Sequence, residues 1–294
     1  MKVRAGLLWA HVFERTEAER AFLTEYLTVE EARYVKGHGG RAKRVAPRER
    51  RLYSPVADTF PAGLVRQVER GAQKEGFAVE VIDERTPPFF VCGLGGSGGW
   101  LRDYQCEAVE VALRETRGIW WIPTGGGKTE CAIALAQAVP AQWLILTHRK
   151  GLMAQAADRF ELRTGEIVGR VGEGAWTEQR VTVATFQTLA RALDKRDAQA
   201  VALVERVEGL VTDEVHVLPS DSFWRVAMAA KRAYWRIGMI GTPLARCDHR
   251  SLLAVAATGP IIYRLRASTL VDAGVLAKPD IRMLPLEQQC EKAT

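Results

Sequence analysis

A glycine-rich turn near the middle of the sequence has the residue types that bind phosphate. Pro123-Thr124-Gly125-Gly126-Gly127-Lys128-Thr129 directly follows the apolar run 118–122 and precedes a stretch of helical character. Glycines let backbone N–H groups turn inward around the β- and γ-phosphates of a nucleotide, and a following helix N-terminus favours the same anion. Lys128 would neutralise phosphate charge, and the Thr129 hydroxyl would bind Mg²⁺. The predicted nucleotide site comprises Thr124, Gly125, Gly126, Gly127, Lys128 and Thr129.

The alternative is an incidental strand-to-helix turn, because the strict pattern of such loops begins with a glycine and this one begins with Ile122. A second group of residues favours the nucleotide site. Asp213 and Glu214 directly follow the apolar run 209–212, and two adjacent carboxylates at the end of a strand require a nearby cation. Asp213 can hold Mg²⁺ through water, and Glu214 can orient and deprotonate an attacking water molecule. A helix N-cap is the other interpretation of the acidic pair.

The elements that must position these residues are indicated by short apolar runs that alternate with helical stretches. Predicted strands cover residues 119–122, 143–146, 181–184, 210–211 and 237–240, and predicted helices cover 129–138, 151–160, 187–193 and 223–232. Continuous apolar runs are typical of strands covered by helices on both faces. This alternation predicts an α/β fold with a doubly wound parallel sheet.

The glycine-rich segment Gly93–Gly99 predicts a linker, so we expect a small α+β N-terminal domain over residues 1–95 and weak packing across the segment. Within the first domain we expect helices over 16–36 and 62–75 and a strand over 77–83. The stretch 33–51 carries eight basic residues against Glu49. It is interpreted either as a solvated loop or as a patch that contacts phosphates through Arg41, Lys43, Arg44 and Arg48.

Composition excludes several classes of protein. The chain has 294 residues, and a hydrophobic fraction of 47% excludes a disordered or collagen-like chain. Five scattered cysteines form no C-x-x-C pair, which suggests neither a zinc site nor a disulfide framework. No run approaches the ~20 consecutive apolar residues that a helix needs to cross a bilayer, so we expect no membrane contact. We expect a cytoplasmic protein, or an intracellular one that is nucleoid-associated or encoded by a phage. The net charge of +6 permits a polyanionic partner.

Further sequence blocks accompany the loop and the acidic pair. They are, in chain order, Leu101–Gln105, Thr147–Arg149, Val183–Leu189, Asp213–His216, Ile237–Pro243, Gly259–Tyr263 and Val275–Pro279. In this combination the chain resembles superfamily 2 DNA helicases and translocases, most of all the xeroderma pigmentosum group B and phage UvsW-type helicases. The resemblance covers Trp100 to about Arg282 and is weak over the first 95 residues.

This resemblance implies a RecA-like P-loop NTPase domain over residues 96–265 that uses ATP and Mg²⁺ and acts on single-stranded, double-stranded or branched DNA. It implies that Arg102 and Gln105 contact the base and that His216 and Thr242 relay the phosphate state. The residues implied to contact nucleic acid are Thr147, Arg149, Thr185 and Gln187. Residues 266–294 would cross into a second RecA-like domain whose arginine finger lies beyond Thr294, so we expect part of a longer motor that hydrolyses ATP poorly.

Two motifs depart from this pattern. The block that ends in Thr242 lacks its usual first hydroxyl, because Ile240 and Gly241 precede the threonine, and Arg246-Cys247-Asp248 lacks the usual central acidic residue. Two further functions share the chemistry or the site: the motor subunit of a restriction or defence system, and a nucleic-acid binding module with an inert ATP pocket. A small-molecule phosphotransferase is the alternative from another class, since a phosphate loop also occurs in kinases.

Overall fold

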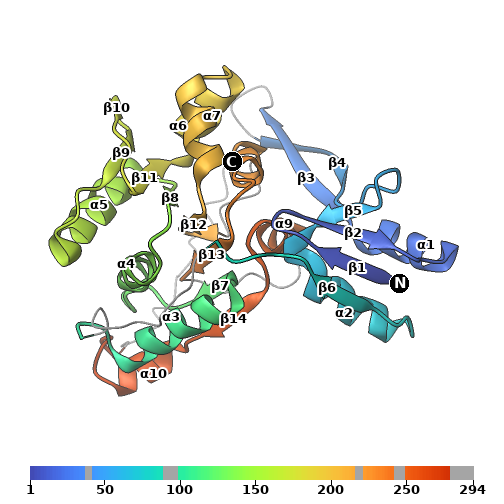
Figure 1. Cartoon of the computed structure of the whole chain (residues 1–294), viewed down its shortest axis with the longest axis horizontal. Coiled ribbons are helices and arrows are strands. Elements are labelled where there is room, and N and C mark those ends of the chain that lie inside the picture. Colours follow the sequence, from blue (N-terminus) through green and yellow to red (C-terminus); the bar gives the residue numbers. More distant parts are fainter. Residues whose placement is uncertain (37–41, 89–98, 216–220, 242–248, 279–294) are drawn as a thin grey trace, which may run out of the picture.

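The largest element of the fold is an eight-stranded, mainly parallel sheet (Figure 1). A computed structural model describes residues 1–36, 42–88, 99–215, 221–241 and 249–278; within these ranges, the side chains of residues 31–36, 42–48, 150, 221 and 249–251 are not described. The strands are, in spatial order, β10 (Ala175–Trp176), β9 (Gly169–Gly172), β11 (Val181–Thr185), β8 (Trp143–Thr147), β12 (Gly209–Thr212), β13 (Trp235–Ile240), β7 (Arg117–Trp121) and β14 (Ile261–Arg264). β10 alone runs antiparallel to its neighbour. The doubly wound sheet is therefore confirmed.

Helices cover both faces of this sheet. One face packs against α3 (Asp103–Glu115), α4 (Lys128–Ala138) and α5 (Lys150–Thr164), with Trp120, Trp143 and Trp235 in the shared core. The other face packs against α6 (Phe186–Asp194), α7 (Ala198–Arg206), α8 (Asp221–Ala229) and α9 (His249–Thr258). Alternate residues of β7 enter opposite cores, since Ile119 belongs to the second core and Trp120 to the first. A last short helix, α10 (Ala267–Asp272), follows β14.

The N-terminal region has a sheet of its own, in the order β5 (Thr59–Pro61), β2 (Trp9–Phe13), β1 (Lys2–Ala5) and β6 (Glu80–Asp83). It carries α1 (Glu17–Tyr26), the 3₁₀ turn η1 (Ala62–Leu64) and α2 (Val65–Lys74). Thr16 begins α1 with a capping box, because its hydroxyl accepts from Glu19 N while the Glu19 carboxylate accepts from Thr16 N. The predicted helix over 62–75 is present as η1 followed by α2, whereas the predicted strand over 77–83 forms only over Glu80–Asp83.

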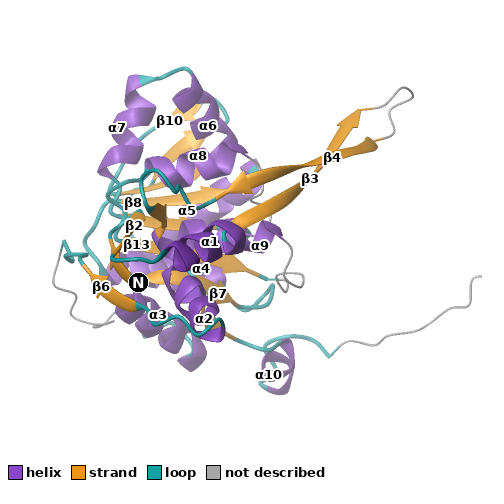
Figure 2. Ribbon diagram, turned by 90° about the vertical axis from the view of Figure 1, so that its right-hand side faces the viewer, coloured by secondary structure: helices purple, strands orange, loops and turns teal. Residues whose placement is uncertain are grey.

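The basic stretch is a β-hairpin rather than a loop. β3 (Thr28–Lys36) pairs antiparallel with β4 (Ala42–Arg51), and the two strands extend away from the rest of the molecule (Figure 2). The expected helix over 16–36 was too long for the same reason: it ends at Tyr26 and the chain continues as β3. Phe22, Tyr26 and Val29 have helical spacing although the helix ends before Val29. The β-branched residues Thr28, Val29 and Val35 favour a strand, and they lie in the two-stranded ribbon.

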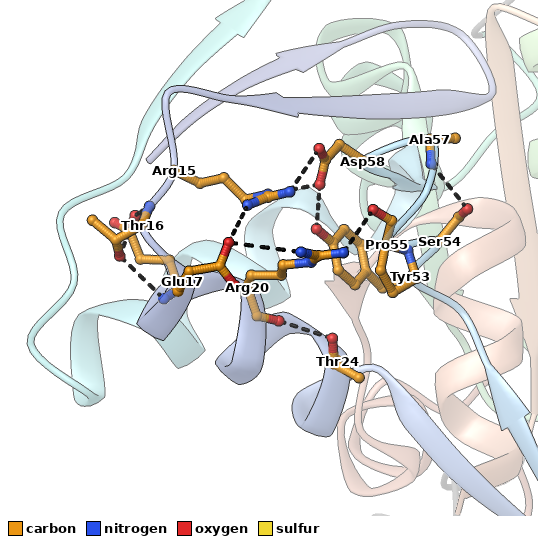
Figure 3. Close-up of polar contacts among 11 residues, drawn as sticks. Arg15, Thr16, Glu17, Arg20, Thr24, Tyr53, Ser54, Pro55, Ala57 and Asp58 are labelled. Atoms are coloured by element: carbon orange, nitrogen blue, oxygen red, sulfur yellow. Dashed lines mark hydrogen bonds and ion pairs between the residues drawn. The ribbon is translucent and has the colours of Figure 1, made fainter.

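A polar network fixes the turn that follows this hairpin (Figure 3). Arg15 donates two hydrogen bonds to the Asp58 carboxylate, at 2.7 and 2.9 Å, and the Tyr53 hydroxyl donates to the same group. The backbone of Asp58 has φ +49° and its carbonyl accepts from Val12 N at 2.7 Å. The turn is thus attached to β2 and to the segment that precedes α1.

The expectation of weak packing across the linker is wrong. Leu253 and Ala256 of α9 belong to the same core cluster as Val3, Phe60 and other N-terminal residues. Gly63 lies so close to α9 that an added Cβ would be 2.2 Å from the Val255 carbonyl oxygen. The apolar face of α9 supplies this contact between the two regions. The boundary between domains at residue 95 stays a prediction.

Candidate nucleotide site

The phosphate loop lies between the carboxyl end of β7 and the first turn of α4. Gly125 and Gly127 have φ of +83° and +81°, which a side chain would strain, so the two glycines are required by the backbone. Ile122 N donates to Ile240 O at 3.1 Å and ties the start of the loop to β13. The loop N–H groups and the α4 N-terminus therefore meet at one edge of the sheet, as an anion site needs.

The other side of the loop is held by α3. The Gln105 amide donates to Gly126 O at 3.1 Å through Nε2, and its Oε1 accepts from Arg102 N at 2.9 Å. Tyr104 also donates to Gly126 O, at 3.1 Å. Gln105 is 2% exposed, so its side chain supports the loop in this structure, and its implied contact with the base remains untested. The role of Tyr104 was not predicted, although an aromatic residue next to Gln105 was a signal for it.

The acidic pair follows β12, whose neighbours are β8 and β13. Asp213 N donates to Leu146 O at 2.9 Å, and the Asp213 carboxylate accepts from Glu214 N at 3.0 Å. Lys128 Nζ lies 3.9 Å from Glu214 Oε1, so the two motifs meet although 86 positions separate them in the chain. Glu214 has φ +50°, a strained backbone of the kind found at functional sites.

Burial raises the pKa of the Asp213 carboxyl, and the neighbouring Glu214 charge raises it further, while Lys128 opposes the shift. A carboxylate in this position gains most from a cation beside it. Asp213 and Thr129 both line a cavity of about 380 Å³. The described residues contain no group of three His, Cys, Asp or Glu side chains that could hold a metal. The Thr129 hydroxyl and the Asp213 carboxylate fit Mg²⁺ held partly by nucleotide phosphates, since this ion rarely has an all-protein cage.

The strand β13 ends against the phosphate loop. A Cβ added to Gly241 would lie 2.7 Å from Thr124 Oγ1 and 3.1 Å from Lys128 Nζ. The block that ends in Thr242 lacks its usual first hydroxyl, and Gly241 within this block has no room for a side chain against the loop. No sequence pattern indicated this close packing. His216 and Thr242, the two predicted relay residues, lie outside the described residues.

The residues implied to contact nucleic acid lie at the same edge of the sheet. Thr147 and Thr185 are directly opposite each other in β8 and β11, but both are buried, and the Thr185 hydroxyl shares a hydrogen bond with Thr188. Arg149 is exposed, and Gln187 donates to His148 O at 3.0 Å. The structure therefore brings these four residues together, with Arg149 the most accessible. Of the basic stretch, Lys43, Arg44 and Arg48 lie on β4 with undescribed side chains, and Arg41 is outside the described residues.

The strand order, with the loop and the acidic pair at one edge of the sheet, is the arrangement of RecA-like helicase domains. The sequence profile of the family described as "Type III restriction enzyme, res subunit" matches residues 99–245, half of the chain. The chain belongs to this family and is a superfamily 2 helicase sequence of the XPB and UvsW kind, as its motifs predicted.

Relatives with assigned names support this grouping. The chain is 33% identical over 184 residues to the DNA 3'-5' translocase XPB2 of Sulfurisphaera tokodaii, covering 63% of this chain and 40% of that protein. It is 32% identical over 188 residues to the DNA 3'-5' helicase XPB of Kineococcus radiotolerans, covering 62% of this chain and 33% of that protein. The chain thus spans less than half the length of these curated relatives.

The fold is shared beyond the family match. A crystal structure of the UvsW helicase from bacteriophage T4 superposes with a TM-score of 0.66 and 18% identity, covering 90% of this chain and all of that one. Since only a tenth of this chain is left out, the shared fold includes most of the N-terminal region, where sequence resemblance was weak. Among the described residues, no helix has the length and apolar character needed to cross a membrane.

Proposed function

We propose that the chain binds Mg·ATP on residues 124–129 and forms the first motor lobe of an ATP-dependent DNA helicase or double-strand translocase. The observation that carries this proposal is the meeting of Lys128, Asp213 and Glu214 at one edge of the sheet. The named functions of the XPB relatives support it.

In this proposal the loop N–H groups and Lys128 bind the phosphates, and Thr129 and Asp213 hold the Mg²⁺ ion. Magnesium supplies neutralisation of charge on the β- and γ-phosphates when bound. Glu214 orients the attacking water and accepts its proton. Lys128 Nζ lies 3.9 Å from Glu214 Oε1, so the phosphate-binding lysine and the proposed base share one site. Arg102 and Gln105 are proposed on the base side, and His216 and Thr242 as the relay.

The nucleotide assignment is tested with two variants. Lys128→Ala removes the phosphate counter-charge and should weaken Mg·ATP binding at least tenfold by isothermal titration calorimetry. Glu214→Gln should bind Mg·ATP as the wild type does and should abolish any turnover that the wild type shows. Lys231→Ala, an exposed lysine in the turn after α8, is the matched control. Equal affinities of the wild type and Lys128→Ala, or equal losses of affinity in both variants, would contradict the role assignments.

The partner is proposed to be DNA, contacted at the exposed Arg149 and along the β3–β4 hairpin through Arg41, Lys43, Arg44 and Arg48. Thr147, Thr185 and Gln187 lie at the same edge of the large sheet as Arg149 and would shape the surface around it. Positive charge along a ribbon that stands clear of the body can follow a phosphate backbone without reading bases.

Replacing Arg41, Lys43, Arg44 and Arg48 with alanine should weaken duplex binding equally for all sequences. The slope of log K against log salt should flatten by about 0.9 for each lost contact. The control replaces Lys195, Arg196, Lys231 and Arg232, which change the net charge equally and lie in the turns after α6 and α8. If both quadruple variants keep the wild-type slope, the hairpin is a solvated arm.

Two alternative functions give different outcomes in the same assays. A binding module with an inert pocket would bind DNA with an affinity that ATP does not change. The description of the matching family favours a restriction or defence motor as a second candidate. Its mark would be turnover stimulated by DNA only in the presence of the other subunits of such a system.

A further inference from the structure

The phosphate loop has a third support besides α3 and β13, and it comes from the far end of the described chain. After β14, Leu265 N donates to Trp121 O at 2.8 Å, one residue before the loop begins. The chain then forms α10 and turns back, because Val275 N and Leu276 N both donate to Leu270 O, at 2.8 and 3.0 Å. This turn directs Leu270 and Leu276 at the loop.

The contacts of these two leucines fall on the loop glycines. A Cβ added to Gly125 would lie 2.8 Å from Leu276 Cδ2, and one added to Gly126 would lie 3.1 Å from Leu270 Cδ1. Leu270 is fully buried, and Leu276 is half-buried against the same core. Each leucine methyl therefore occupies the space that a side chain at the loop would need.

We infer that Leu270 and Leu276 are positioning residues for ATP, acting as an apolar clasp that holds the phosphate loop in its binding shape before nucleotide arrives. This inference rests on the proposed nucleotide site. A glycine-rich loop has no side chains to stabilise its own conformation, and glycine loses more backbone entropy on ordering than any other residue. Ordering the loop in advance removes that loss from the free energy of binding.

The Gly126 carbonyl already accepts from Tyr104 and Gln105, so the polar side of the loop is fixed by α3. The clasp holds its apolar side at the adjacent Gly125. The loop is thus held on its polar side by α3 and on its apolar side by Leu270 and Leu276, which lie more than 150 positions further along the chain. None of these supporting side chains is among those that we propose to bind phosphate.

The test measures Mg·ATP affinity by calorimetry in the whole chain. Leu276→Ala should weaken binding about fivefold, and Leu276→Val, which shortens the side chain by one carbon, about twofold. Leu276→Met, of similar volume, should restore affinity. Ile167→Ala, an aliphatic residue that is 71% exposed, is the control and should bind as the wild type does.

A double-mutant cycle with Gly125→Ala separates the clasp from general loss of stability. The left-handed backbone of Gly125 strains alanine in any background, but the clash with Leu276 exists only when Leu276 is present. Gly125→Ala should therefore weaken binding less in the Leu276→Ala background than in the wild type. Additive losses, or wild-type affinity of Leu276→Ala, would overturn the clasp. Failure of the wild type to bind Mg·ATP would instead overturn the proposed function.

Discussion

Asp213 is buried beside a second carboxylate, and this arrangement makes the functional residue a source of instability. Burial and the neighbouring Glu214 charge both disfavour the ionised form of Asp213. Asp213→Asn should therefore raise the free energy of unfolding at neutral pH by roughly 1 kcal/mol while abolishing Mg²⁺-dependent nucleotide binding. Chemical denaturation and calorimetry on the same samples measure both effects.

The pH dependence follows from the direction of the shift. A carboxyl whose pKa is higher in the folded than in the unfolded state binds more protons when folded, so its contribution to stability falls as pH rises through that window. The gain in stability of Asp213→Asn over wild type should thus shrink as pH is lowered below the raised pKa. A gain that stays constant down to pH 4 would contradict the assigned cause.

Local motifs made part of the site predictable. Lys128, Asp213 and Glu214 were identifiable because each stands in a short pattern at the end of an apolar run, and parallel strands bring such ends to one edge. The hydrogen bond from Gln105 to Gly126 and the closeness of Gly241 to Lys128 were not predictable. Both depend on which non-adjacent strands and helices become neighbours, and no local pattern in the sequence encodes this.

At the scale of elements, the Arg15–Asp58–Tyr53 network determines how the hairpin is rooted (Figure 3). Hydrogen bonds from Arg15 hold the pKa of Asp58 below its usual range, and burial with the Asp58 contact raises the pKa of Tyr53 to about 12. Asp58→Ala should lower the free energy of unfolding by about 1–3 kcal/mol at pH 7, because it leaves Arg15 and Tyr53 without their acceptor.

The sign of this contribution is opposite to that of Asp213. A depressed carboxyl pKa adds stability above the unfolded value, and this stability is lost as pH falls through the folded pKa. The difference between wild type and Asp58→Ala should therefore narrow in acid. Tyr53→Phe removes one hydrogen bond and keeps the ring, so its effect should be smaller, about 1 kcal/mol. Thermal melts across pH 3 to 7 compare all three proteins.

The predicted elements were most accurate where burial is two-sided. All five predicted strands of the large sheet are present, since continuous apolar runs leave few alternatives. The strands β9, β10 and β14 were missed. β9 begins and ends with glycine, β10 has only two residues, and β14 lies at the edge of the sheet. The hairpin was missed because residues 28–36 and 42–51 show no regular alternation of apolar and polar residues in the sequence.

For the whole molecule, the contact between Gly63 and α9 decides whether the N-terminal region and the motor lobe move as one body. Gly63→Ala places a methyl group against the Val255 and Ala256 carbonyls and should lower stability by about 1–3 kcal/mol. Amide hydrogen exchange in α9 should accelerate. Gly151→Ala, with no atom within 4 Å of the added Cβ, is the control. Unchanged exchange in α9 would show that the region is hinged after all.

The base of the hairpin has a contact of its own with the helices of the large sheet, because Arg50 stacks over Trp224 of α8 at 4.9 Å. Nine residues of β3 extend about 30 Å at ~3.3 Å per residue. Over such a radius, a tilt of about 6.5° at the base moves the outer end by roughly 3.4 Å, the rise of one base pair along a duplex strand. A small tilt at the base is therefore amplified along the arm, and under the proposed contact with DNA a shift of α8 would move the end of β3 by about one step along the duplex.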